Sequence, residues 1–160
     1  MNRYQFLHTG SYTKIIMHNI PEKPGVFAKI FNLLAAQKIN ILTVKHSMHS
    51  TEKGDIAFTV SMEDSDQSLQ LMQDNIKLIE ASSISYKKNL ALVFMHGTEI
   101  VNLPNFASDV LRAFSEYNVE FDSLSLAIEG VTCILPEDQL QKALHAFNKM
   151  FVDEPIISPI

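Results

Sequence analysis

Residues 24–41 read PGVFAKIFNLLAAQKINI, and residues 104–121 read PNFASDVLRAFSEYNVEF. When position 24 is aligned with position 104, the apolar residues of the two stretches coincide, as Ile30 with Val110 and Leu34 with Phe114 show. Further on, IAFTV (56–60) aligns with VTCIL (131–135), at an offset that is shorter because the polar stretch HSMHSTEKG (46–54) has a reduced counterpart. The chain is therefore predicted to contain two copies of one module, with a shorter hairpin in the second copy.

Each copy has the pattern of strand, helix, two strands, helix and a last strand. In the first copy the strands are expected at 14–20, 41–48, 55–61 and 82–88, with Pro24 in the first turn of one helix and Asp64 capping the other through Gln67. In the second copy we expect strands at 90–96, 121–126, 131–135 and within 155–160, and helices at 106–117 and from Leu140 onward. This order predicts an α+β fold of two ferredoxin-like βαββαβ modules, at 13–88 and 89–160, each an antiparallel sheet with its helices on one face.

Composition limits the classes of partner. The chain has 160 residues, of which 46% are hydrophobic and 19% charged, with 13 Lys and Arg against 18 Asp and Glu. A net charge of −5 argues against nucleic acid or an anionic membrane as the main partner. A single cysteine, Cys133, cannot form an internal disulfide, and no apolar run could span a bilayer. We therefore expect a soluble, cytoplasmic protein.

Signatures of enzymes are missing from the sequence. It has no phosphate-binding glycine loop, no GxSxG, no HExxH and no CxxC. Cys133 lies in the alternating apolar run VTCIL, which favours a buried structural thiol over a nucleophile. The six histidines are scattered, so no metal site and no cofactor is expected. The strand IAFTVSM (56–62) also lacks the basic and aromatic pattern of an RNA-binding sheet.

The turn PEKPG (21–25) is the one feature with the geometry of a binding site. A proline–glycine turn at a helix start leaves backbone N–H groups unpaired near the positive end of the helix dipole, where a carboxylate can bind. Glu22 beside this turn could pair with an ammonium group. Amides for a carboxylate and an acid for an ammonium would suit an α-amino acid. The alternative is an ordinary tight connection between strand and helix.

The stretches PEKPGVFAKIFNLLAAQKINI (21–41), GDIAFTV (54–60) and LQKALHAFNKMF (140–151) resemble the tandem ACT regulatory region of the aspartate kinase family. The resemblance covers nearly the whole chain, but it is specific mainly in the first module. It implies that a strand at residues 3–8 joins the sheet of the second module, so that the two modules are intertwined. It also implies that the kinase catalytic domain is absent from this chain, which is then not an enzyme by itself.

The resemblance implies an effector-binding site. In the first module it assigns Glu22, Lys23, Pro24, Gly25, Val26, Phe27, Asn40, Ile41 and His46 to this site, and in the second module Asn105, Ala107, Glu120 and Phe121. Phe27, His46 and Glu120 replace the family's Ala, Gln and Asn, respectively. These replacements add a ring at the pocket rim, a titratable group and a charge, so we expect altered binding and a degenerate second site.

The resemblance implies feedback regulation by lysine, threonine or both, in a homodimer that assembles through its ACT modules and controls a kinase catalytic domain or subunit. The chain would then be a regulatory region of a longer enzyme, a separate regulatory subunit or a stand-alone ACT protein. A second hypothesis is an assembly module whose exposed sheet edges pair between chains without any effector. An amino acid would raise the melting temperature only under the first hypothesis.

Overall fold

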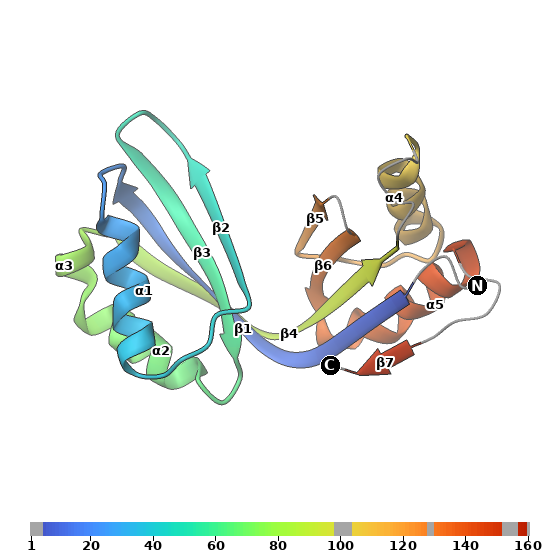
Figure 1. The fold of residues 1–160 in the computed structure, drawn as a ribbon, viewed down its shortest axis with the longest axis horizontal. Coiled ribbons are helices and arrows are strands. Elements are labelled where there is room, and N and C mark those ends of the chain that lie inside the picture. Colours follow the sequence, from blue (N-terminus) through green and yellow to red (C-terminus); the bar gives the residue numbers. More distant parts are fainter. Residues whose placement is uncertain (1–4, 98–103, 128–129, 152–156, 160) are drawn as a thin grey trace. The chain divides into compact units, whose positions relative to one another are not determined.

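A computed structural model describes residues 5–97, 104–127, 130–151 and 157–159. The elements are, in chain order, β1 (Gln5–Pro21), α1 (Val26–Ala36), β2 (Thr43–Met48), β3 (Lys53–Ser61), α2 (Ser65–Asp74), α3 (Ile76–Ile79), β4 (Ser83–His96), α4 (Phe106–Glu116), β5 (Ser123–Ala127), β6 (Gly130–Pro136), the 3-10 helix η2 (Glu137–Gln139), α5 (Leu140–Phe151) and β7 (Ile157–Pro159) (Figure 1). No described helix has the length and apolar character needed to cross a membrane.

The contacts within the chain form two compact units, which we name by their place in the sequence. The middle unit is Ser11–Asn89, and the flanking unit combines Met1–Gly10 with Leu90–Ile160. Each unit has its own hydrophobic core, and the two cores have no residue in common.

The middle unit has the strand order β2-β3-β1-β4. Both β1 and β2 pair with β3 in antiparallel register, and Phe58 of β3 lies opposite Ile15 of β1 and Val44 of β2. Helices α1 and α2 lie along one face of this sheet (Figure 1). The core between helices and sheet is built from apolar residues of both layers, among them Ile15, Ile30, Leu34, Phe58 and Met72.

The flanking unit repeats this arrangement. Its strand order is β1-β4-β6-β5, in which β4 and β5 pair antiparallel with β6, and β7 pairs in parallel with the first residues of β1. Phe114 of α4, Cys133 of β6 and Phe147 of α5 are fully or almost fully buried in its core. The first residues of β1 thus join the sheet of the flanking unit, although residues 3 and 4 of the strand expected there lie outside the described residues, as do 155, 156 and 160 of the tail. These two sheets confirm the expected α+β, ferredoxin-like fold class.

The repeat in the sequence corresponds to equivalent positions in the two cores. Ile30 and Val110 are both completely buried, and so are Phe58 and Cys133. Helices α1 and α4 also end in the same way, because Lys38 and Asn118 both have a left-handed φ, 59° and 51°, just after the helix. Both main-chain N–H groups of the residues that follow, Ile39 and Val119, return to a carbonyl inside the helix.

Cys133 illustrates what this burial does chemically. Its side chain has no exposed surface, and burial, assisted by the nearby charge of Asp122, raises the pKa of the thiol to about 12. The nucleophilic thiolate is therefore scarce at neutral pH. The thiol fills the core, as the apolar run VTCIL predicts.

The elements differ from the expected ones in four places. The strands expected at 82–88 and 90–96 form one strand, β4, interrupted only by the left-handed φ of 57° at Asn89. Pro24 precedes α1 instead of lying in its first turn, because Gly25 is the N-cap. Asp64 is the N-cap of α2, but its carboxylate accepts a hydrogen bond from Ser61 Oγ at 2.9 Å and does not cap the helix. Gln67, its expected partner, instead donates to Gln37 at 3.2 Å.

Candidate functional site

The turn between β1 and α1 is held by backbone hydrogen bonds. The N–H of Glu22 donates to the carbonyl of Glu52 at 2.8 Å, and the N–H of Lys23 donates to the carbonyl of Pro21 at 2.8 Å. The first bond ties the turn to the β2–β3 hairpin. Glu22 is therefore fixed at the end of β1, directly before the start of a helix.

The N-terminus of α1 has no side-chain cap. Gly25 adopts a left-handed conformation with φ of 87°, which a glycine accepts without steric cost. The N–H of Val26 is used by the carbonyl of Lys23, at 3.3 Å, whereas the next two N–H groups, those of Phe27 and Ala28, lie in the helical turn that has no intrahelical partners. These amides, at the positive end of the helix dipole, could bind a carboxylate.

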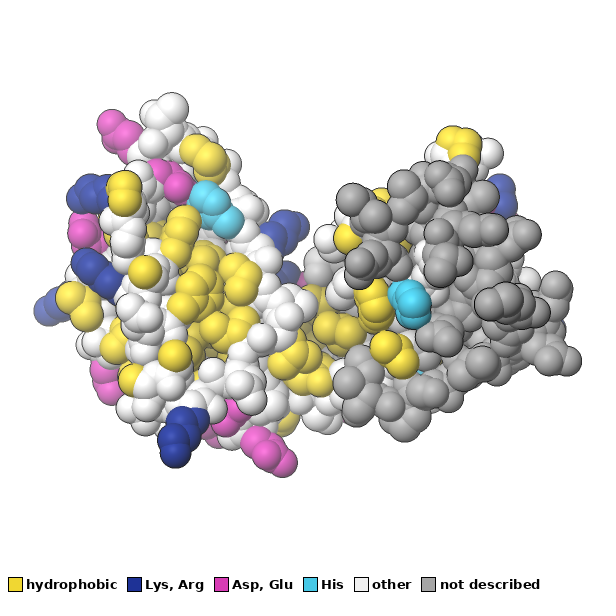
Figure 2. Space-filling view, in the orientation of Figure 1, with side chains coloured by type: hydrophobic (Ala, Val, Ile, Leu, Met, Phe, Trp, Pro, Cys, Tyr) yellow, Lys and Arg dark blue, Asp and Glu magenta, His cyan; other side chains and the backbone are white. Residues whose placement is uncertain are grey.

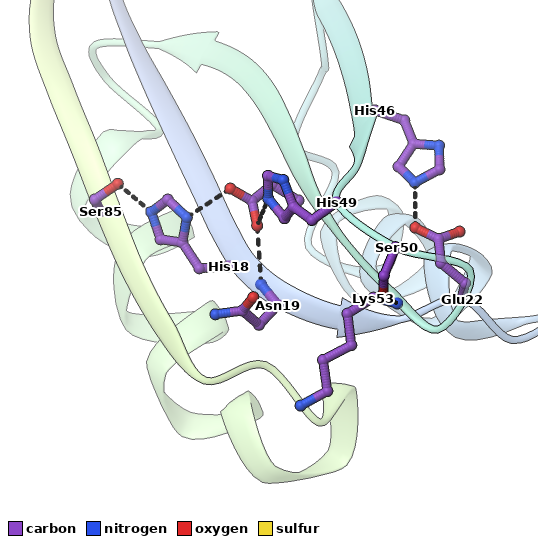
Figure 3. A network of polar contacts seen from close by, with 9 residues as sticks. His18, Asn19, Glu22, His46, His49, Ser50, Lys53 and Ser85 are labelled. Atoms are coloured by element: carbon purple, nitrogen blue, oxygen red, sulfur yellow. Dashed lines mark hydrogen bonds and ion pairs between the residues drawn. The ribbon is translucent and has the colours of Figure 1, made fainter.

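The acid beside this turn already has a partner. Glu22 Oε1 lies 2.6 Å from Nε2 of His46 on β2, and the two side chains are only 13% and 32% exposed. The ring of Phe27 on α1 meets the imidazole edge to face, with 4.7 Å between ring centroids. Three of the residues that the sequence assigns to the effector site thus touch one another (Figure 3 shows the Glu22–His46 pair).

Gly54 makes room for this pair. It is the second residue of β3, buried and opposite Met48 of β2. A Cβ at position 54 would collide with Glu22 Oε1 and with the backbone carbonyl of Ser47, and it would come within 3.1 Å of His46 Nε2. The Glu22 carboxylate therefore occupies space that only a glycine at this position leaves open.

A second polar cluster lies on the same end of the sheet. Asp55 accepts hydrogen bonds from His18 Nδ1 at 2.8 Å and from the N–H of Asn19 at 2.9 Å, and it pairs with His49 Nε2 at 2.9 Å (Figure 3). The other nitrogen of His18 lies 2.7 Å from Ser85 Oγ on β4. Partial burial acts to raise the pKa of Asp55, but the hydrogen bonds from Asn19, His18 and His49 outweigh it and lower the pKa below its usual value. The cluster connects β1, β3 and β4.

This second cluster cannot be inferred from the sequence. His18 and His49 look scattered there, because a separation of 31 positions along the chain says nothing about contact between neighbouring strands. The register of β1 against β3, which places Ile20 opposite Gly54, brings Asp55 to both. In the part of the chain that the structure describes, no three His, Cys, Asp or Glu side chains are placed to hold a metal ion.

The remaining first-module positions are close in sequence but make different contacts. Lys23 is exposed, and its Nζ lies 3.5 Å from Glu80 Oε2. Asn40 is exposed, whereas Ile41 is half-buried against the core of the middle unit. Val26 is 4% exposed and belongs to the same core, so its side chain is not available to a ligand.

The second-module positions belong to the flanking unit. Asn105 is the N-cap of α4 without a side-chain cap bond, and Ala107 lies half-buried in the first turn. Glu120 is exposed and its N–H donates to Gln139 Oε1 at 3.4 Å, while the ring of Phe121 packs on Phe114 with 5.5 Å between centroids. Residues 98–103, which lead into α4, lie outside the described residues. No counterpart of the Glu22–His46 pair is formed by these four positions.

An apolar surface borders the site. Hydrophobic side chains gather over β2 and α1 of the middle unit (Figure 2). Leu42 just before β2 and Val44 and Met48 within it are 40%, 53% and 62% exposed. Among the described strands, β2 lies at the edge of this sheet. Exposed apolar residues on an edge strand are typical of a surface that another chain covers.

Comparison with known proteins gives one consistent group of relatives. No family model matches the chain. An aspartokinase of Corynebacterium efficiens is 27% identical over 143 residues, and aspartokinase 2 of Bacillus subtilis is 22% identical over 139 residues. These matches cover 88% and 87% of this chain. The chain spans about a third of the length of these relatives, 34% in both cases.

Solved structures show the same fold. The ligand-free regulatory subunit of aspartate kinase from Thermus thermophilus superposes with a TM-score of 0.79 at 19% identity, covering 91% of this chain and 96% of that subunit. A chain of aspartokinase alpha and beta subunits gives a TM-score of 0.81 at 21% identity, with 92% and 97% coverage. Aspartate kinase from Synechocystis gives 0.85 at 20% identity, with 92% of this chain but only 26% of that one. The chain is thus a relative of the aspartokinases over about a third of their length, with the fold of their tandem ACT regulatory region.

Proposed function

We propose that this chain is an amino-acid-binding regulatory region of aspartate kinase, and that lysine, threonine or both bind at the β1–α1 turn of the middle unit as feedback effectors. The kinship with aspartokinases and the absence of catalytic signatures in the sequence support a regulatory role. The observation that carries the effector site is Glu22, a carboxylate held next to the uncapped N-terminus of α1.

The chemistry of the turn fits a zwitterion. The amides of Phe27 and Ala28 can receive the ligand carboxylate, which the helix dipole stabilises by about 0.3–1 kcal/mol in addition to the hydrogen bonds themselves. Glu22 can receive an ammonium group, and such charge-assisted hydrogen bonds contribute about 1.5–3 kcal/mol. The left-handed Gly25, around which a Cβ would meet nothing within 4 Å, leaves open space in front of the turn.

The proposal extends to partners. The exposed apolar residues along β2 support a homodimer that forms through the ACT modules, next to the effector turn. The kinship further supports a kinase catalytic domain or subunit as the element that is controlled. An effector then acts by binding one arrangement of the modules more tightly than another, since a ligand with equal affinity for both would shift nothing.

Isothermal titration of the purified chain with L-lysine and with L-threonine tests the effector site. We expect at least one of them to bind, and Glu22→Gln to weaken that binding by about tenfold or more, because it removes the charge that pairs with the ammonium group. Glu63→Gln is the matched control: Glu63 is exposed in the turn before α2, and its replacement should leave the affinity unchanged. Equal affinities of wild type and Glu22→Gln would overturn this site.

The apolar edge of β2 favours a second candidate function, an assembly module without effector. The two functions give different thermal melts. A sensor gains melting temperature when lysine or threonine is added, whereas a pure assembly module gains it only when the protein concentration rises.

A further inference from the structure

The acid of the effector turn is occupied by the protein itself. His46 Nε2 lies 2.6 Å from Glu22 Oε1, the oxygen that also touches the space above Gly54. With only 13% of its side chain exposed, Glu22 offers little other surface to a ligand. An ammonium group and the imidazole of His46 therefore compete for one carboxylate.

We propose that His46 is a proton-controlled gate on this site, which closes it at acidic pH and sets the strength of the cation that can enter. This inference rests on the proposed function, because it concerns the same turn. The imidazole is held in the closed position from two sides: it binds Glu22 on one side and meets the ring of Phe27 on the other, with 4.7 Å between centroids. Opening the site breaks one hydrogen bond and one ring contact, without any change in the backbone of β2.

Few other charged groups surround the gate. Among the described residues, β1 contributes Glu22 to the surroundings of His46, α1 contributes the uncharged Phe27, and β3 contributes the uncharged Gly54. On β2 itself, Lys45 points to the opposite face because neighbouring side chains of a strand alternate. The other charges nearby are paired with each other: His18 and His49 with Asp55, and Lys23 with Glu80. The Glu22–His46 pair thus responds mainly to its own proton.

The direction of the pH effect follows from this competition. A histidine side chain changes its charge between about pH 5 and 8. When protonated, His46 forms an ion pair with Glu22, which a ligand must break, and the bound ammonium group then lies beside an imidazolium that repels it. Binding of the ligand is therefore coupled to release of a proton, and by reciprocity the affinity rises with pH. One coupled proton changes the dissociation constant by at most tenfold per pH unit.

The test measures the dissociation constant of L-lysine, and in parallel of L-threonine, at about pH 5.5 and 7.5, on either side of the ordinary histidine transition. The side-chain ammonium of lysine stays charged over this range. For the wild-type chain we expect the dissociation constant to be about tenfold or more larger at the lower pH. In His46→Gln this ratio should fall below about twofold, mainly through tighter binding at the lower pH. His49→Gln is the matched control: it removes a histidine of the same hairpin that pairs with Asp55 instead of Glu22, and it should keep the wild-type ratio.

Each outcome has one meaning. Binding by His46→Gln but not by the wild type would support a gate that is closed at every pH tested. Wild-type binding that is independent of pH, or a pH dependence that persists in His46→Gln, would overturn the gate and leave the effector site intact. Failure of both the wild type and His46→Gln to bind either amino acid at either pH would overturn the effector site and the gate together.

Discussion

Replacing Gly54 by alanine is expected to disrupt the effector turn more than any other change of one methyl group. The added Cβ would collide with Glu22 Oε1 and with the carbonyl of Ser47, which belongs to the backbone of β2 and cannot rotate away. We expect the free energy of unfolding to fall by about 1–3 kcal/mol, as is usual for overpacking. The Glu22 carboxylate must also leave its position, so binding of lysine or threonine should weaken by about tenfold or more.

Chemical denaturation and calorimetric titration of Gly54→Ala measure both effects. Gly10→Ala is a suitable control, because the Cβ at position 10 would approach only the flexible side chain of Glu137, at 2.9 Å from Oε1, which can move. It should cost little stability and leave binding unchanged. If Gly54→Ala bound amino acids as tightly as the wild type, the position of Glu22 beside His46 would be irrelevant to the site.

Replacing Phe58 by alanine should destabilise the middle unit strongly. Phe58 lies in the middle of β3, is completely buried and pairs with both neighbouring strands. Its ring also meets that of Phe31 on α1, with 6.4 Å between centroids. Truncation of a buried phenylalanine costs about 3–5 kcal/mol, from lost burial and from the cavity that remains.

The repeat supplies the matched comparison for this substitution. Cys133 occupies the equivalent position in the flanking unit and is also completely buried, but it is much smaller. Cys133→Ala should therefore cost only about 1 kcal/mol. Urea denaturation of the two variants, followed by far-ultraviolet circular dichroism, checks the difference. Equal losses of stability would mean that the two positions are not equivalent in their cores.

The fold was largely predictable because it is written twice. Apolar residues recur at equivalent positions of both copies, and the equivalent pairs Ile30 and Val110, and Phe58 and Cys133, are buried together. The extent of β1 and β4 was not predictable from pattern alone. Asn89 reads as a break between two strands, yet one left-handed residue is accommodated within a continuous strand, which ends one module and begins the next.

The candidate site was predictable in its members and not in its contacts. The resemblance to aspartate kinases placed Glu22, Phe27 and His46 in one site, and the structure places them in contact. That His46 binds Glu22 could not be inferred, because it depends on the register of the β2–β3 hairpin, in which Met48 lies opposite Gly54. The expected turn at residues 52–54 would have given another register. In the structure β3 already begins at Lys53, and the Ser50 hydroxyl accepts the N–H groups of the turn.

The capping pair at α2 shows why local motifs can mislead. Asp64 and Gln67 have the spacing of a reciprocal cap, but Ser61 lies closer to the carboxylate and donates to it. A competing hydrogen bond from the end of β3 therefore decides the outcome. Such competition between neighbours is invisible to a motif that considers only two positions.

The central claim, that an amino acid binds at the start of α1, is tested most directly by nuclear magnetic resonance of the isotope-labelled chain during titration with L-lysine and with L-threonine. The account predicts that the largest changes in chemical shift fall on the amides of Phe27 and Ala28 and on the ring of His46, and that the amide of Ala107 in the first turn of α4 changes little. Saturating amounts of both amino acids that leave Phe27, Ala28 and His46 unshifted would contradict it.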